Sequence, residues 1–178
     1  MGPLAGPVVA AAVVFPPGLG LCGVDDSKRL TAARRAALAG EIRDRALAWA
    51  VVEVEPQEID ALNIYRAGLE AMRRAIARLD PPPDHVLLDG RQIPGLDLPH
   101  ERIVHGDATC HAIAAASILA KTRRDALMSE YDARYPGYDF GAHKGYATEA
   151  HRAALRRLGP SPIHRRSFLL LPHPKLWD

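Results

Sequence analysis

The chain has 178 residues, of which 48% are hydrophobic and 25% are charged, and its formal net charge is +2. Such a chain can close one hydrophobic core and is too short to suggest two, so we expect a single domain over residues 1–178. Its longest apolar run, Val8–Phe15, is too short to span a bilayer, and no basic region precedes it as in a secretory signal. We therefore expect neither a membrane protein nor an exported one.

The distribution of charges and the placement of the cysteines further limit the class of protein. Residues 121–166 hold ten Lys or Arg against five Asp or Glu, which suits a phosphate backbone, although solvated helix faces would give the same pattern. Cys22 and Cys110 have no partner at metal-ligand spacing, which argues against a zinc site and against a disulfide framework. We expect a protein of the reducing cytoplasm.

The first quarter of the chain predicts a strand, a helix and a second strand. The β-branched and Ala run Val8–Phe15 is typical of a strand that is buried on both faces. Thr31 offers an N-cap for a helix that reaches about Ala46. Residues 49–55 alternate as a strand does.

The middle of the chain predicts one long helix and a strand that ends in a carboxylate. Apolar side chains recur at three- and four-residue steps over residues 59–79, which indicates a single amphipathic helix. After a proline-rich turn, residues 85–90 form a short apolar strand that closes on Asp89 and Gly90.

The second half predicts one more strand and two helices. Residues 101–105 form the strand, and 106–109 make the turn into a helix that reaches about Tyr131. Residues 135–147 are loop-like, and Thr148 caps a last amphipathic helix that stops near Gly159. The order of elements predicts an α/β domain with a mixed sheet, but it does not say which strands pair.

Asp89 is the first candidate for chemistry. It stands at the C-terminal end of a predicted buried strand, where α/β sheets usually present ligands. Carboxylate oxygens suit Mg²⁺ or Mn²⁺. The alternative is an aspartate that only forms a turn in an Asp-Gly pair.

Asp125 is the second candidate. In the predicted long helix it follows Ser117 by eight residues and Lys121 by four, so the three side chains share nearly one face. The Ala-rich stretch 112–120 would let this helix pack closely and bring Asp125 to a metal. The alternatives are ordinary core packing and a surface aspartate paired with neighbouring arginines.

Three segments could contact nucleic acid. In His143-Lys144-Gly145-Tyr146, the lysine could hold a phosphate and Tyr146 could stack on a sugar or base, although packing under a loop is the alternative for the ring. Lys28 follows the first strand and a turn and could reach a phosphate. Arg165 belongs to a basic run near the C-terminus that could equally be solubilising.

Taken together, these segments resemble ribonuclease HII, and the resemblance covers essentially the entire chain. The motifs that carry it in the first half are Gly2–Val8, Asp26–Leu30, Leu62–Ile64 and Leu88–Gly90. Those of the second half are closer still and comprise Gly106-Asp107, Ala114–Lys121, Arg124-Asp125, His143–Tyr146 and His164–Phe168. Several ordered motifs are more specific than any one alone.

The resemblance implies a ribonuclease H-like fold, with a mixed central sheet flanked by helices over 1–134 and a helical part that grips the hybrid over 135–178. It implies an endonuclease that cuts the RNA strand of RNA/DNA hybrids and nicks 5′ to ribonucleotides embedded in DNA. Two divalent cations, Mg²⁺ or Mn²⁺, would serve the reaction and leave 5′-phosphate and 3′-hydroxyl ends. By motif position, Asp89 and Asp125 would be catalytic metal ligands, and Tyr146 would stack at the RNA-to-DNA junction. The other predicted substrate contacts are Gly2, Lys28, Lys144 and Arg165.

The family pattern also includes an Asp-Glu pair and a Gly-Arg-Gly motif, of which only the last Gly has a counterpart here, Gly2. Two of four carboxylates and the first strand would therefore be missing, and we expect weak metal binding and little cleavage by the 178-residue chain. An in-frame Asp-Glu upstream of Met1 would restore the enzyme. The alternative function is a chain that binds hybrids without cutting them, with salt-sensitive affinity and no metal requirement.

We expect a cytoplasmic monomer whose partners are RNA/DNA hybrids and ribonucleotide-containing duplex DNA. No motif for binding a replication clamp is evident in Leu169–Asp178. A third interpretation, an unrelated α/β scaffold, would require several ordered motif matches to be coincidental.

Overall fold

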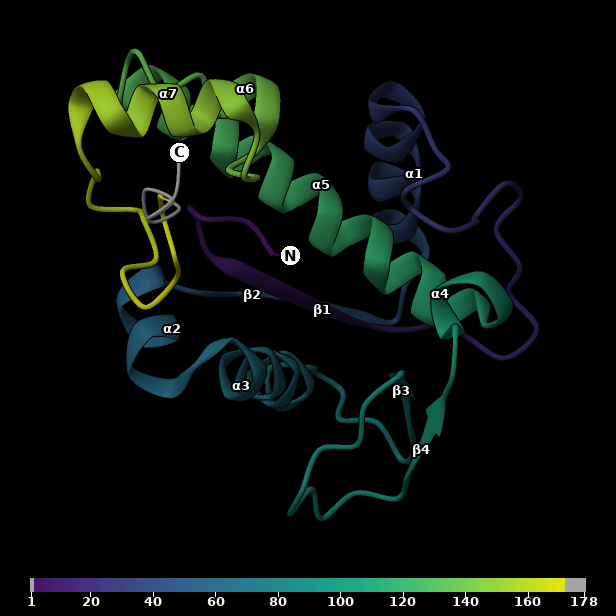
Figure 1. The fold of residues 1–178 in the computed structure, drawn as a ribbon. Helices are drawn as coiled ribbons and strands as arrows, with labels where there is room; N and C mark the ends of the chain where they lie inside the picture. The colour runs from purple at the N-terminus through teal and green to yellow at the C-terminus, as the bar shows by residue number, and fades with distance from the viewer. Residues whose placement is uncertain (1, 172–178) are drawn as a thin grey trace. The chain divides into compact units, whose positions relative to one another are not determined.

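A computed structural model of the chain describes residues 2–171, and it confirms the predicted α/β class (Figure 1). In chain order the elements are β1 (Val8–Val14), α1 (Ala32–Arg45), β2 (Ala48–Val54), α2 (Pro56–Leu62), α3 (Ile64–Ala77), β3 (Val86–Asp89), β4 (His100–Ile103), α4 (Gly106–Thr109), α5 (His111–Arg134), α6 (Phe140–His143) and α7 (Glu149–Leu158). No helix within residues 2–171 combines the length and apolar character needed to cross a bilayer. The expectation about a clamp motif concerns Leu169–Asp178, of which residues 172–178 lie outside the described range.

The chain forms two compact units. Unit 1 comprises Met1–Val8, Val54–Ala67 and Arg124–Asp178, and unit 2 comprises Val9–Glu53 and Gly68–Arg123. The helices α3 and α5 each contribute residues to both units. The single domain, and its division at residue 134, stay predictions.

The two predicted N-caps are confirmed. The Thr31 hydroxyl accepts a hydrogen bond from the amide of Arg34 at 3.2 Å and starts α1. The Thr148 hydroxyl accepts one from the amide of His151, also at 3.2 Å, and starts α7. Each side chain satisfies an amide that the first turn of a helix would otherwise leave unpaired.

The single helix predicted over residues 59–79 is wrong, because Asn63 separates α2 from α3. Asn63 has a φ of 70°, and its side-chain oxygen accepts hydrogen bonds from the amides of Tyr65 at 3.0 Å and Arg66 at 3.1 Å. Asparagine tolerates a positive φ better than most residues and caps helices well. The apolar periodicity continues across this residue while the helical backbone does not.

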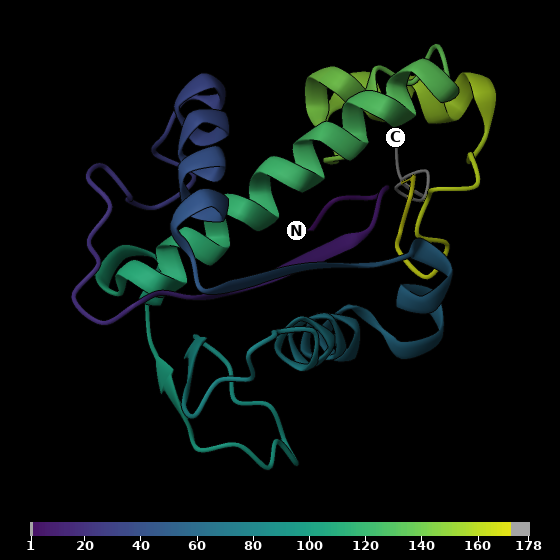
Figure 2. The same ribbon diagram turned by 180° about the vertical axis from the view of Figure 1, so that it is seen from behind.

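In unit 2, β1 and β2 form a two-stranded sheet that is covered on both faces. The amide of Leu47 donates to the carbonyl of Val14 at 2.8 Å, so the start of β2 lies beside the end of β1 and the strands are antiparallel. Ala11 and Val13 pack against the cluster built by α1 and α5, and Ala12 packs against the cluster of α3 and β3. Figures 1 and 2 show the same arrangement, with α1 and α5 on one side of the strands and α3 on the other. Every residue of β1 keeps some exposure, because within residues 2–171 its sheet contains only β2 as a partner.

The second sheet pairs β3 with β4 in parallel, with Val86 opposite His100 and Asp89 opposite Ile103. The four strands therefore form one antiparallel and one parallel pair in separate sheets, where the sequence predicted one mixed sheet. Since parallel strands end at the same edge, the residues that follow β4 come close to Asp89. Those residues are the one-turn helix α4.

Candidate active site and substrate loop

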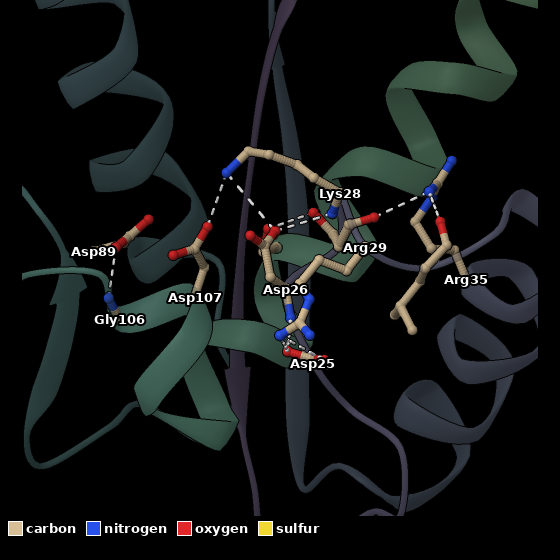
Figure 3. A network of polar contacts seen from close by, with 11 residues as sticks. Asp25, Asp26, Lys28, Arg29, Arg35, Asp89, Gly106 and Asp107 are labelled. Carbon is tan, nitrogen blue, oxygen red and sulfur yellow. Dashed lines mark hydrogen bonds and ion pairs between the residues drawn. The ribbon is translucent and has the colours of Figure 1, made fainter.

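Unit 2 gathers three carboxylates around one lysine, and we call Asp26, Lys28, Asp89 and Asp107 the carboxylate cluster (Figure 3). The ammonium of Lys28 lies 3.0 Å from the Asp107 carboxylate and 3.7 Å from that of Asp26. The hydrogen bond to Asp107 raises the pKa of Lys28 above its usual value, against the effect of partial desolvation. The charges of Asp107, Asp26 and Asp89 act in the same raising direction.

The turn that carries Lys28 is held in place by contacts of the preceding residue, Ser27. Ser27 is buried, and its hydroxyl lies 2.9 Å from the hydroxyl of Ser117 on α5. The Arg35 guanidinium donates to the Ser27 carbonyl at 3.0 Å. Lys28 itself stays 74% exposed, so a fixed backbone presents a cation that solvent can reach.

Asp89 ends β3, as the sequence predicted, and its side chain is exposed. The amide of Gly106 donates to Asp89 Oδ1 at 3.1 Å and orients the carboxylate. A Cβ atom at position 106 would lie 2.5 Å from Ile113 Cδ1, so a larger residue there would have to displace the Ile113 side chain. The Asp-Gly turn is therefore accompanied by a specific contact to a second loop.

Asp107 is a candidate that sequence reasoning missed. It lies in the Gly106-Asp107 motif, one residue after the amide that binds Asp89, and shares Lys28 with it. The signal that could have found it is the parallel pairing of β3 with β4, since ligands collect at the carboxyl ends of parallel strands. Chain order alone does not reveal that pairing.

The donor set fits a divalent cation of the magnesium type. Such an ion keeps several waters and takes one or two carboxylates from the protein, which Asp89 and Asp107 can supply. In the part of the chain that the structure describes, no group of three or more His, Cys, Asp or Glu side chains could form a complete protein cage. The cluster thus suits one hydrated Mg²⁺ or Mn²⁺.

Asp125 lies on α5 in unit 1, whereas Asp89 lies in unit 2. Its carbonyl accepts hydrogen bonds from the Ser129 hydroxyl at 3.1 Å and from the Lys144 ammonium at 3.4 Å. A joint metal site of Asp89 and Asp125 stays a prediction.

Residues His143–Tyr146, which we call the tyrosine loop, hold two successive residues with positive φ. Lys144 has a φ of 51° and Gly145 one of 80°. A Cβ atom at Gly145 would lie 2.5 Å from the carbonyl oxygen of Ala5, so no larger residue fits. The loop presents Tyr146 with 47% of its surface exposed, and the Arg124 guanidinium lies 5.8 Å from the ring centroid.

The other predicted substrate contacts of unit 1 differ in accessibility. Lys144 extends its ammonium to the Ser129 hydroxyl at 3.1 Å. Arg165 is only 2% exposed and donates to the carbonyls of Gly6 at 2.9 Å and Pro7 at 3.2 Å. Burial lowers the pKa of its guanidinium to about 10, and nearby Arg124 acts in the same direction.

Gly2, the remaining predicted contact, is exposed. A Cβ atom there would lie 3.8 Å from the Phe168 ring, an ordinary contact, so the space around it does not require glycine. The substrate roles of Gly2, Lys28, Lys144, Tyr146 and Arg165 stay predictions.

The described geometry is that of a ribonuclease H class of α/β protein. The chain is similar to the crystal structure of the ribonuclease H2 from Pyrococcus horikoshii OT3, with a TM-score of 0.80 and 25% sequence identity, over 95% of this chain and 90% of that one. Residues 1–171 match the family described as Ribonuclease HII, and the chain therefore belongs to the ribonuclease HII family. Ribonucleases are hydrolases that act on RNA.

Two relatives named Ribonuclease HII illustrate the range of lengths. The chain is 59% identical to that of Laribacter hongkongensis (strain HLHK9) over 169 residues, which cover 94% of this chain and 85% of the relative. It is 58% identical to that of Anaeromyxobacter sp. (strain Fw109-5) over 168 residues, which cover 94% of this chain and 53% of the relative. The chain thus spans about half the length of the latter protein.

Proposed function

We propose that the chain is an endonuclease that hydrolyses the RNA strand of RNA/DNA hybrids and nicks 5′ to ribonucleotides embedded in DNA. The observation that carries the proposal is the juxtaposition of Asp89 and Asp107 at the ends of two parallel strands, in a chain of the ribonuclease HII family. The exposed Asp89 carboxylate, with the partly exposed Asp107 carboxylate beside it, is suited to a cation that must also meet a phosphodiester.

The residues divide the work by chemical type. Asp89 and Asp107 would hold Mg²⁺ or Mn²⁺, and Asp125 is the further ligand expected of a two-metal site. When bound, such cations would supply an activated water and stabilisation of the leaving 3′-oxygen, and the products would carry 5′-phosphate and 3′-hydroxyl ends. Lys28 and Lys144 would attract phosphates, and the Tyr146 ring would stack at the RNA-to-DNA junction.

A second candidate function is binding of hybrids without cleavage. Two observations favour it: residues 2–171 offer no group of three metal-ligating side chains, and the Lys28 ammonium already neutralises Asp107. The excess of basic residues over 121–166 would serve binding in either case.

One pair of assays separates the two functions. A labelled duplex with a single ribonucleotide is incubated with the chain in Mg²⁺ or in EDTA, and its binding is measured in EDTA over a salt series. Cleavage in Mg²⁺ supports the endonuclease and contradicts the sequence-based expectation of little cleavage by the 178-residue chain. Salt-sensitive binding without cleavage supports the second candidate, and the absence of both contradicts the two proposals.

Substitutions locate the activity. Asp89→Asn and Asp107→Asn should each lower the cleavage rate by about 100-fold or more, since even loss of a group behind a metal ligand costs roughly 10- to 100-fold. The matched control is Asp84→Asn, an exposed aspartate just before β3, which should cleave as the unmodified chain does. Equal rates for all three variants would remove the carboxylate cluster from the mechanism.

A further inference from the structure

Three histidines of unit 1, two of them buried and one partly buried, form a cluster that the proposed chemistry does not use. His151 on α7 is 0% exposed and His164 is 1% exposed. His143 stacks on His151 with ring centroids 4.3 Å apart and planes 13° apart. The buried ring of Phe140 meets both of these histidines edge-on, at 82° and 84°.

The hydrogen bonds of His151 and His164 define one direction of donation. The amide of Ser161 lies 2.9 Å from His164 Nδ1, and an amide can only donate, so this nitrogen accepts. His164 Nε2 therefore carries the proton and donates to His151 Nε2 at 3.0 Å. His151 Nδ1 in turn donates to the carbonyl of Tyr146 at 2.8 Å. Both rings are neutral, and each has a single allowed tautomer.

His143 is assigned by the same reasoning. Its Nδ1 accepts from the amide of Gly145 at 3.1 Å, and its Nε2 donates to the carbonyl of Tyr138 at 2.7 Å. All six ring nitrogens of the cluster thus have a partner. The cluster offers no nitrogen to a metal ion, and an added proton would have to break a hydrogen bond.

Two of these bonds end on the tyrosine loop. His143 holds the amide of Gly145, and His151 holds the carbonyl of Tyr146, the residue that follows. The loop needs such restraint, because Lys144 and Gly145 both adopt positive φ, which costs free energy at a residue with a side chain. His151 and His164 are buried, whereas the Tyr146 ring is exposed. The backbone of the tyrosine loop connects the buried histidines to this exposed ring.

We propose that His151 and His164 are positioning residues, which form a neutral hydrogen-bond relay from Ser161 to the Tyr146 carbonyl and so fix the backbone that presents the Tyr146 ring to nucleic acid. The proposal rests on the proposed function, because it requires that Tyr146 contact the substrate. Neither histidine touches the substrate.

A matched pair of substitutions at position 151 tests the relay in the full chain. The amide nitrogen of Asn can take the place of His Nδ1, so His151→Asn can still donate to Tyr146, whereas Gln places its amide near Nε2 and cannot. We expect His151→Gln to weaken binding of a duplex with a single ribonucleotide, in EDTA, by about 10-fold, since small misplacements are costly. His151→Asn should stay within about 3-fold, although both variants lose the same aromatic packing.

A double-mutant cycle with Tyr146→Ala separates this proposal from the proposed function. Tyr146→Ala should weaken binding by about 10-fold or more if the ring stacks on the substrate. In that background His151→Gln should add nothing, because the relay acts only through Tyr146. No effect of Tyr146→Ala contradicts the substrate contact itself. An effect of Tyr146→Ala, with His151→Gln equally harmful in both backgrounds, overturns the relay alone.

A direct measurement covers the case in which His151→Gln does not fold. The ¹⁵N chemical shifts of the histidine rings in the unmodified chain report which nitrogen is protonated. The relay requires His151 with its proton on Nδ1 and His164 with its proton on Nε2. The opposite tautomer at either residue, or a charged ring at neutral pH, overturns the proposal.

Discussion

The carboxylate cluster of unit 2 and the tyrosine loop of unit 1 present their functional groups by opposite means. In the cluster, a lysine that is 74% exposed meets two carboxylates that are only 15% and 21% exposed, in ion pairs of 3.0 and 3.7 Å. In the loop, the backbone that carries the exposed Tyr146 ring is held by partly buried hydrogen bonds to neutral histidine rings. Exposed ion pairs contribute little to stability, whereas buried polar networks are costly to disturb. We therefore expect the cluster to tolerate substitution without unfolding and the loop not to.

The largest expected effect is that of Gly145→Ala. The added Cβ would lie 2.5 Å from the Ala5 carbonyl oxygen at a φ of 80°, so we expect a loss of about 3 kcal/mol or more in the free energy of unfolding. The control is Gly20→Ala, where a Cβ meets nothing within 4 Å. Urea unfolding of both variants checks this. If Gly145→Ala were as stable as the control, the tyrosine loop would tolerate substitution as well as the carboxylate cluster does, against our expectation.

The second effect is a loss of stability in acid, centred on His164. Burial, together with repulsion from His151 when that ring is protonated, lowers the pKa of His164 to about 4 from 6.5. Between pH 6.5 and pH 4, His164 is protonated in the unfolded chain and neutral in the folded chain. The folded state therefore has its full stability above pH 6.5 and loses stability as the pH falls to 4. The shift corresponds to about 3 kcal/mol.

Urea titrations from pH 7 to pH 4 measure this slope. Burial also lowers the pKa of His151, so the two histidines act in the same window. The slope should shrink in His164→Gln and persist in His85→Gln, whose ring is exposed. A slope that is unchanged in His164→Gln would show that the acid sensitivity arises elsewhere.

Asn63→Ala should have an intermediate effect. The substitution removes the side-chain cap of α3 and places alanine at a φ of 70°, which is unfavourable for a residue with a Cβ atom. The free energy of unfolding should fall by about 1–2 kcal/mol. Asn63→Gly loses the cap but accepts the backbone, so it should cost only a few tenths. Thermal unfolding ranks the three chains. If Gly proved worse than Ala at this position, the backbone conformation would not be the constraint.

The smallest effect on stability should come from Lys28→Ala in the carboxylate cluster. Since the Lys28 side chain is 74% exposed, the free energy of unfolding should change by less than about 0.5 kcal/mol. Removal of the cation should instead lower the Mg²⁺ concentration needed for nicking and reduce the salt slope of hybrid binding by about 1. Arg29→Ala, which breaks only the pair with Asp25, is the control. A marked loss of stability in Lys28→Ala would erase the contrast between the two regions.

The features that were predictable from sequence are the local ones. Thr31 and Thr148 were found because a cap lies next to the helix that it starts. The break at Asn63 was missed because the apolar stripe runs on through it. Asp107 depends on the pairing of β3 with β4, and the histidine relay joins residues of three segments, so neither follows from spacing. Arginine is typical of protein surfaces, so the sequence does not predict that Arg165 is buried. Its partners Gly6 and Pro7 lie near the other end of the sequence.

Those distant partners also set a time order for folding. The amide of Leu4 donates to Gly145, the amide of Gly6 donates to Ile163, and the amide of Arg165 donates back to Leu4. During synthesis, residues 4–7 must therefore wait for a partner 159 positions later, about 8 to 30 seconds at ordinary rates of translation. Until Arg165 has left the ribosome, residues 4–7 lack these partners, so completion of unit 1 is a late step of folding.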